Sequence, residues 1–198
     1  FDGEGREYRC VIADIGSRSM TLTVAEETEA AKPESPLDLT LAVALLKGEK
    51  FDLVVQKATE LGVTRLVPVI TARADVRIRE PRDAARKVER WQRIALEASK
   101  QCGRARLMQV NAPTSLDEFF RSITDVHLGM IFTARDGGSV DVAIETKPDF
   151  KSVIALVGSE GGWTDEELMQ ASKFGWQLVT LGGRTLRTET EVIVSVSL

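Results

Sequence analysis

The sequence is poor in the residues that build disulfide frameworks and metal sites. It contains two cysteines, Cys10 and Cys102, and one histidine, His127, among 198 residues. Two cysteines so far apart make neither a disulfide framework nor a metal-ligand cluster, and they fit a reducing cytoplasm. A histidine without a cysteine or carboxylate cluster around it predicts no metal site, and we expect His127 in a strand, at a sheet edge or in the core.

Long apolar runs and targeting signals are also missing. No apolar stretch approaches the ~20 residues that cross a bilayer, and the N-terminus lacks the basic start and apolar stretch of a signal peptide. We therefore expect a cytoplasmic protein with no membrane partner. The sequence begins at Phe1 rather than at a methionine, which is consistent with a fragment or a processed form.

The net charge is −4, but the basic residues are concentrated in one stretch of the sequence. Residues 73–106 carry eleven basic and five acidic side chains. A local basic surface on an acidic protein is expected for a polyanion partner, because each neutralised phosphate releases counterions. The alternative is a solvated helix face. The candidate RNA contacts are Arg86, Arg90, Arg93, Arg104 and Arg106.

The first 36 residues differ in pattern from the rest. Residues 7–15 and 19–26 read as two strands joined at Gly16, and a segment rich in Glu, Ala and Pro follows. Because two strands do not make a stable domain alone, we expect residues 1–36 to be the C-terminal part of a small β module plus a linker. Residues 37–198 form the second domain.

Strands and helices alternate after residue 37. Pro81 suits a first helical position, and Thr164 with Glu167 has the spacing of a capping box. Alternation of this kind predicts an α/β fold, a mostly parallel sheet with helices on both faces. The expected strands cover residues 39–45, 65–70, 126–132, 152–157 and 177–181, and the expected helices cover 50–61, 81–102, 165–174 and a final helix from about 188.

Two glycine-rich loops follow consecutive predicted strands near the C-terminus. They are residues 158–162, Gly-Ser-Glu-Gly-Gly, and residues 182–187, Gly-Gly-Arg-Thr-Leu-Arg. Parallel sheets bind ligands beyond the carboxyl ends of their strands, and glycine lets a ligand approach the backbone. Neither loop has the P-loop or dinucleotide-binding spacing, and Glu160 would repel a pyrophosphate. These loops therefore favour a cofactor without phosphates over ATP or NAD.

The same loops and their flanks resemble a known family. The signature of the RsmE family is similar to Val157-Gly-Ser-Glu-Gly-Gly-Trp-Thr-Asp-Glu-Glu-Leu together with Leu181-Gly-Gly-Arg-Thr-Leu-Arg-Thr-Glu-Thr. The runs that begin at Lys47, Trp91 and Gln101 also resemble that family, so the likeness covers about residues 38–198. Its members are SPOUT-class methyltransferases that modify N3 of a uridine in 16S ribosomal RNA. Residues 1–36 resemble the end of the PUA-like RNA-binding barrel that these enzymes carry.

The resemblance implies a C-terminal trefoil knot, against the general rule that chains avoid knots. It also implies a homodimer whose partner is the 16S RNA of the small ribosomal subunit. S-adenosylmethionine would lie in the knot, held mainly by backbone groups. The residues expected to bind it are Phe132, Thr133, Val157, Gly158, Ser159, Glu160, Gly161, Gly162, Leu181, Gly182, Gly183, Leu186 and Arg187.

Four residues are the candidates for catalysis. Arg187 would stabilise negative charge on the uracil oxygens, because a guanidinium is always charged and donates in a fork. An equal and compatible role is to bind the carboxylate of Glu160 or Glu189. Glu160 would orient Arg187 or a substrate group. Thr188 is expected to cap the final helix, and Glu189 lies in its first turn, where a role as base is the lesser alternative.

The sequence departs from the family pattern at four positions. Ser159 and Gly183 stand where proline is common, Glu191 where a small residue is usual, and Lys100 where an acid is typical. Trp163 either covers the cofactor or a base, or simply packs, which is the commoner role of a tryptophan beside a helix start. Three other functions stay open: an RNA-binding module without cofactor affinity, a different small-molecule α/β enzyme, and a methyltransferase with another RNA target.

Overall fold

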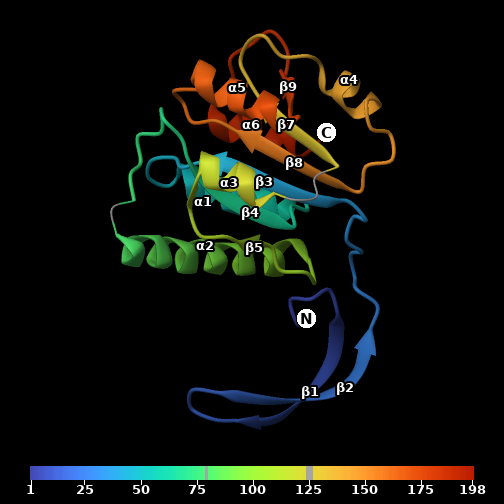
Figure 1. Ribbon diagram of the computed structural model, residues 1–198. Coiled ribbons are helices and arrows are strands. Elements are labelled where there is room, and N and C mark those ends of the chain that lie inside the picture. Colours follow the sequence, from blue (N-terminus) through green and yellow to red (C-terminus); the bar gives the residue numbers. More distant parts are fainter. Residues whose placement is uncertain (79, 124–126) are drawn as a thin grey trace.

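A computed structural model describes residues 1–78, 80–123 and 127–198. The chain forms an α/β body and a hairpin that projects from it (Figure 1). Arg79, counted in the basic stretch, and Val126, predicted as the start of a strand, lie outside the described residues. None of the helices in the described part of the chain has the length and apolar character needed to cross a bilayer.

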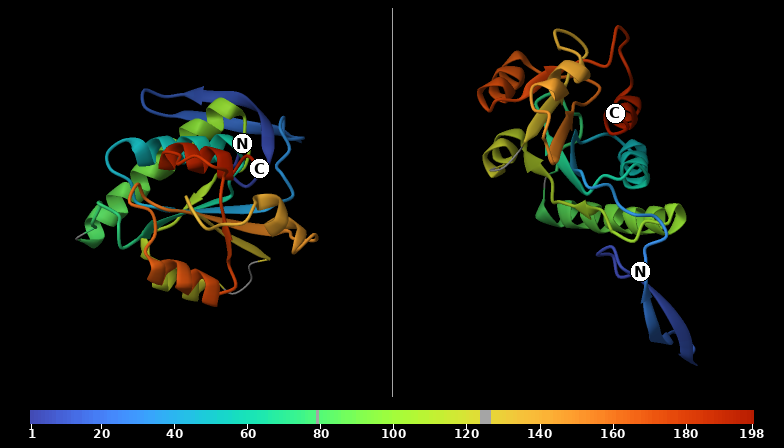
Figure 2. Two further views of the ribbon diagram at one scale, coloured as in Figure 1. Left: turned by 90° about the horizontal axis from the view of Figure 1, so that it is seen from above. Right: turned by 90° about the vertical axis from the view of Figure 1, so that its right-hand side faces the viewer.

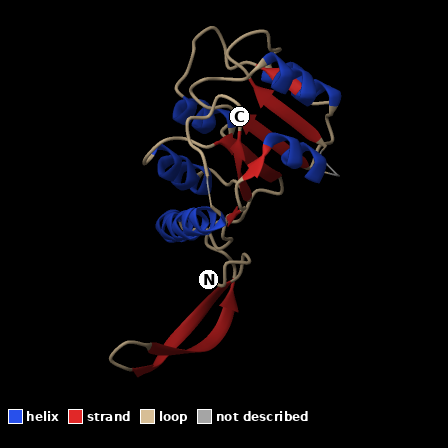
Figure 3. Ribbon diagram, turned by 60° about the vertical axis from the view of Figure 1, so that its left-hand side comes forward, coloured by secondary structure: helices blue, strands red, loops and turns tan. Residues whose placement is uncertain are grey.

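The projecting hairpin consists of β1 (Glu7–Ile15) and β2 (Met20–Thr28), which pair antiparallel. The turn between them is closed by the Gly16 amide, which donates to the Ser19 carbonyl at 2.8 Å. Apolar side chains of both strands, among them Val11, Ile15 and Leu22, are more than half exposed. The hairpin stands clear of the α/β body in the view of Figure 3 as well.

A parallel sheet forms the centre of the body. Its strand order is β5-β4-β3-β8-β7-β9, with β6 paired to β4, and every pairing within it is parallel. All described residues of β7 are buried, as are five of the six in β8, which is the burial expected of strands covered on both faces. The strands are β3 (Asp38–Ala44), β4 (Arg65–Ile70), β5 (Gln109–Val110), β6 (Thr114–Ser115), β7 (Leu128–Phe132), β8 (Ser152–Val157) and β9 (Gln177–Val179).

Helices cover both faces of this sheet (Figure 2). One apolar cluster contains side chains from α1 (Lys50–Glu60), α2 (Pro81–Cys102), α4 (Val140–Glu145) and α6 (Thr188–Ser195). A second cluster, on the other face, contains side chains from α3 (Leu116–Ser122) and α5 (Asp165–Lys173). The predicted α/β class and mostly parallel sheet are therefore confirmed.

Single residues explain how each face is packed. On the first face the Phe51 and Trp91 rings lie 4.2 Å apart between their centroids, which joins α1 to α2. On the second face a Cβ at Gly129 would lie 2.7 Å from the Trp176 ring, so β7 needs glycine there for the indole to reach the sheet. The predicted end of α2 is confirmed, because Gly103 has φ 77°, the left-handed conformation that glycine adopts most easily.

His127 is the exception among the predicted strand residues. It lies one residue before β7 and is exposed, so its placement in a strand or in the core is wrong. Its Nδ1 accepts a hydrogen bond from the Lys151 amide at 3.1 Å. This bond joins the segments that lead into the neighbouring strands β7 and β8 and gives the side chain a structural role.

Candidate active site

The loops that follow β7, β8 and β9 meet around a cleft of about 500 Å³ at the carboxyl edge of the sheet. This volume lies within the range of small-molecule sites, roughly 300–1,000 Å³. The cleft is lined by ten of the residues predicted for cofactor binding or catalysis: Phe132, Thr133, Gly158, Ser159, Glu160, Gly161, Gly162, Leu181, Leu186 and Thr188. Five others lie outside its lining, namely Val157, Gly182, Gly183, Arg187 and Glu189.

The loop of residues 158–162 is held by close packing at its glycines. A Cβ at Gly158 would lie 3.1 Å from the Trp163 ring, and a Cβ at Gly161 would lie 2.9 Å from the Cβ of Arg73. The Trp163 indole donates to the Phe132 carbonyl at 2.7 Å, which ties this loop to the end of β7. Arg73 donates to the Gly161 carbonyl at 3.1 Å. Trp163 therefore packs beneath the loop and also lines the cleft.

Ser159 carries a polar group with no evident structural use. The residue is 7% exposed, and its hydroxyl has no hydrogen-bond partner within the described part of the chain. Leaving a buried hydroxyl unpaired costs roughly 1–3 kcal/mol. Because Ser159 also lines the cleft, a bound ligand is a suitable partner for this hydroxyl.

Glu160 forms an ion pair that joins the loop to α1. The Lys50 ammonium lies 2.7 Å from the Glu160 carboxylate. Their hydrogen bond lowers the pKa of Glu160 and raises the pKa of Lys50. The expectation that Glu160 orients Arg187 is not met, because the described ion pair of Glu160 is to Lys50. Arg187 and Glu189 lie close enough to influence the same ammonium.

The start of α6 differs from its prediction. Arg187 is the N-cap residue, without a side-chain capping bond, and Thr188 is the first helical residue. The prediction that Thr188 caps this helix is therefore wrong; its side chain is buried and lines the cleft instead. One carboxylate oxygen of Glu189 is buried without a partner among the described residues. Glu191 also lines the cleft, and burial raises its pKa.

Several residues at the cleft are not among those predicted from the sequence. Residues 134–136 follow β7 directly, so the rule about the carboxyl ends of strands applies to them as well. Asp136 has φ 60°, uncommon for a residue other than glycine. Lys50 and Arg73 come from segments about 110 and 88 residues away from their partners in the loop. No local pattern in the sequence indicates such contacts.

The candidate RNA contacts separate into two groups. Arg86, Arg90, Arg93 and Arg106 are exposed. Two of them form ion pairs at the surface, Arg86 with Asp83 and Arg90 with Asp52, and such pairs contribute little to stability. They remain available to phosphates.

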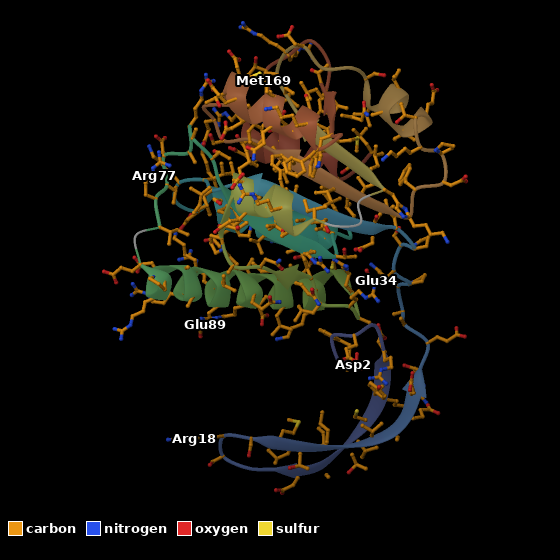
Figure 4. The ribbon with its side chains drawn as sticks, viewed as in Figure 1. Asp2, Arg18, Glu34, Arg77, Glu89 and Met169 are labelled. Atoms are coloured by element: carbon orange, nitrogen blue, oxygen red, sulfur yellow. The ribbon has the colours of Figure 1, made fainter. Side chains whose placement is uncertain are left out.

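Arg104 does not belong to this surface. Its side chain is 7% exposed and donates to both carboxylate oxygens of Glu34, at 3.0 and 2.7 Å. It also donates to the carbonyls of Thr59 and Val63, at 2.7 and 3.0 Å. The prediction that Arg104 contacts RNA is wrong, because its guanidinium already joins the linker to the end of α1. Figure 4 places Glu34 where the linker passes the C-terminal end of α2.

Within residues 1–78, 80–123 and 127–198 no three His, Cys, Asp or Glu side chains are grouped so as to hold a metal ion. The charged groups at the cleft are instead arginines and carboxylates, together with Lys50.

Comparison with known proteins identifies the family of the chain. Residues 33–198 match the model of the RNA methyltransferase domain family. The ribosomal RNA small subunit methyltransferase E of Aquifex aeolicus is 31% identical, over 98% of this chain and 81% of that protein. The enzyme of the same name from Synechocystis is 34% identical, over 100% of this chain. This chain spans 63% of the length of the Synechocystis relative.

Solved structures agree with these relatives. A putative methyltransferase from Legionella pneumophila, in complex with the bound cofactor S-adenosylmethionine, matches with a TM-score of 0.89 and 34% identity, covering 100% of this chain and 79% of that one. The ribosomal RNA small subunit methyltransferase E of Neisseria gonorrhoeae, bound to S-adenosylmethionine, matches with a TM-score of 0.86 and 30% identity at the same coverage. The chain therefore belongs to the family of RNA methyltransferase domains that includes the ribosomal RNA small subunit methyltransferases E.

Proposed function

We propose that this protein is an S-adenosylmethionine-dependent methyltransferase that modifies N3 of a uridine in the 16S RNA of the small ribosomal subunit. The observation that carries the proposal is the cleft at the carboxyl edge of the sheet, in a chain of this family. Two relatives of similar fold were solved with S-adenosylmethionine. The proposal makes the ten lining residues named above the core of the cofactor site.

The residues of the cleft suit this cofactor. S-adenosylmethionine has no phosphates but many hydrogen-bonding groups, and the cleft offers glycine-rich backbone together with the unpartnered Ser159 hydroxyl. Gly158, Gly161 and Gly162 would expose their backbone to it, and Phe132, Leu181 and Leu186 would contact its apolar parts. Gly182, Gly183 and Val157 would support these loops from behind the lining.

In the proposed reaction the bound cofactor supplies an electrophilic methyl group. The protein has to place uridine N3 in line with it and favour the form of the base that has lost its N3 proton. Arg187, exposed at the start of α6, would stabilise the negative charge that develops on the uracil oxygens. Glu160 is a poor proton acceptor, because the Lys50 hydrogen bond lowers its pKa. Its role would be to hold Lys50 and the loop in place.

Arg187→Ala is expected to lower the rate of methyl transfer by about a hundredfold, the loss typical of removing one charge-stabilising donor. Affinity for S-adenosylhomocysteine should stay within roughly threefold, because Arg187 lies outside the cleft lining. Single-turnover methylation of 30S subunits and calorimetric titration measure the two quantities. Arg187→Lys keeps the charge without the forked donors, so its rate of methyl transfer should lie between those of wild type and Arg187→Ala. Transfer by Arg187→Ala within a few-fold of wild type would remove Arg187 from the reaction.

The RNA would lie along the basic face of α2 and the projecting hairpin. The exposed Arg86, Arg90, Arg93 and Arg106 would contact phosphates. The exposed apolar side chains of β1 and β2 support a larger β module at this end. We assign residues 1–36 to the C-terminal part of a PUA-like RNA-binding module with its linker, and residues 37–198 to a SPOUT methyltransferase domain.

A trefoil knot and a homodimer belong to the same proposal. The knot is supported by the path of the chain after β9, an edge strand: residues 180–187 pass the carboxyl edge of the sheet, and α6 then contacts β8 and α1. A homodimer would cover exposed apolar side chains near the C-terminus, such as Leu198. Light scattering tests the dimer. With this substrate the protein would act in the cytoplasm.

The decisive experiment is a calorimetric titration of the protein with S-adenosylhomocysteine, followed by a methylation assay on 30S subunits that lack the modification. One-site binding and methyl transfer to a uridine N3 are expected. RNA binding without affinity for either cofactor form would support the RNA-binding module instead. Cofactor binding with methylation of a different RNA would retain the enzyme and replace the substrate.

A further inference from the structure

Glu191 differs from every other charged residue that lines the cleft. It lies in the first turn of α6 and is half-buried, whereas the other six are exposed. Exposed charges are screened by water and salt, and a half-buried charge is screened much less. The six exposed residues are Arg73, Arg135, Asp136, Glu160, Asp165 and Arg184.

Glu191 is the half-buried acid among the charges at the cleft. The lining carries three arginines and four acids, and Lys50, which pairs with Glu160, is a fourth cation beside it. Among the described residues no lysine, arginine or histidine forms an ion pair with Glu191. Burial raises the pKa of its carboxyl group, which means that its ionised form lacks compensation in the protein alone. A cation in the cleft would supply that compensation.

The two forms of the cofactor differ by one such charge. S-adenosylmethionine carries a sulfonium, an ammonium and a carboxylate, so it has a net positive charge. When uridine N3 forms its bond to the methyl carbon, the sulfur–carbon bond breaks and its electron pair returns to sulfur. The N3 proton leaves to water. The product, S-adenosylhomocysteine, is a thioether with no net charge. A half-buried carboxylate therefore attracts the substrate form more strongly than the product form.

We infer that Glu191 is a specificity-determining residue that makes the cleft prefer the sulfonium cofactor to its thioether product. The inference rests on the proposed function, because it concerns the cofactor of that same site. It gives a use to a half-buried carboxylate that lines the cleft and has no ion-pair partner in the described part of the chain. The preference for substrate would help the product to leave after each transfer.

Calorimetric titration of wild type, Glu191→Gln and Glu166→Gln with each cofactor form tests this inference. In Glu191→Gln the ratio of the two dissociation constants is expected to shift toward the product by roughly tenfold. Most of the shift should come from weaker binding of S-adenosylmethionine, with S-adenosylhomocysteine affinity within about threefold of wild type. Glu166 is the matched control, because it is an exposed acid in the first turn of α5 and lies outside the cleft lining. Its variant should keep the wild-type ratio.

The outcomes separate this inference from the function on which it rests. If folded wild-type protein binds neither form, the proposed function fails and the inference falls with it. If wild type binds both and Glu191→Gln keeps the same ratio, only the role of Glu191 is overturned. A ratio that changes equally in Glu166→Gln would also overturn the role of Glu191, since the effect would then come from the electrostatic field of the whole protein. Glu191→Ala provides a second variant, and its retained product binding verifies that the cleft is intact.

Discussion

Arg104→Ala is expected to lower the free energy of unfolding by about 3–5 kcal/mol, the range for breaking a buried ion pair by removing one partner. The change would leave the half-buried Glu34 carboxylate and the buried Val63 carbonyl without the Arg104 donor, and the Thr59 carbonyl with only the Gly62 amide at 3.2 Å. For a chain of this size the loss corresponds to a fall of roughly 10 °C in the melting temperature. Urea denaturation followed by circular dichroism measures the first quantity, and a thermal scan measures the second.

Arg106→Ala is the matched control for this prediction. Arg106 is two residues away and exposed, so its removal should change the free energy of unfolding by less than about 0.5 kcal/mol. RNA affinity should fall in Arg106→Ala and stay unchanged in Arg104→Ala, because a phosphate contact requires an exposed guanidinium. Equal stability of the two variants, with RNA affinity lost only in Arg104→Ala, would restore Arg104 as an RNA contact.

Elements defined by neighbouring residues could be predicted from the sequence. Pro81 and Gly103 mark the two ends of α2 because proline lacks an amide donor and glycine tolerates a left-handed φ. The capping box of Thr164 and Glu167 is present with both of its hydrogen bonds. The same signal, Ser115 with Glu118, opens α3, and it was available in the sequence although no helix was predicted there.

Features that depend on distant segments could not be predicted. Arg104 was interpreted as a surface cation because it follows a basic helix, but the returning linker covers it with Glu34, 70 residues away. Likewise Glu160 was expected to act on Arg187 in the neighbouring loop, and its partner is Lys50 at the start of α1. In both cases the sequence indicates a charge that needs a partner, and only the fold decides which partner is near.

The place of the cleft could be predicted from the sequence, but the residues that line it could not. The carboxyl edge of the sheet was predictable, because parallel strands end on the same side and their glycine-rich loops must meet there. Which residues of those loops face the cleft depends on how the chain turns after each strand. Leu181 and Leu186 line it, whereas Gly182 and Gly183 between them do not. The glycines therefore shape the loop that presents its neighbours.

Gly182→Val is expected to weaken binding of S-adenosylhomocysteine by at least about a hundredfold. Gly182 has φ 97°, and a Cβ built there meets nothing within 4 Å. The substitution is therefore expected to strain the backbone and not to cause a side-chain clash, because a β-branched residue strongly disfavours this φ. The loop would turn differently and withdraw Leu181 and Leu186 from the cleft that they line. Calorimetric titration measures the loss.

Gly175→Val separates this effect from a general loss of stability. Gly175 has φ 76° and likewise meets nothing within 4 Å of an added Cβ, but it lies just past the C-terminal end of α5. Both variants should lose a similar free energy of unfolding, about 1–2 kcal/mol for one strained residue, while Gly175→Val keeps wild-type affinity. Equal losses of affinity would mean that strain anywhere in this half of the chain disables the cleft. Wild-type affinity in Gly182→Val would mean that the loop after β9 does not hold the cofactor, and the site would then have to be built from the loops after β7 and β8 alone.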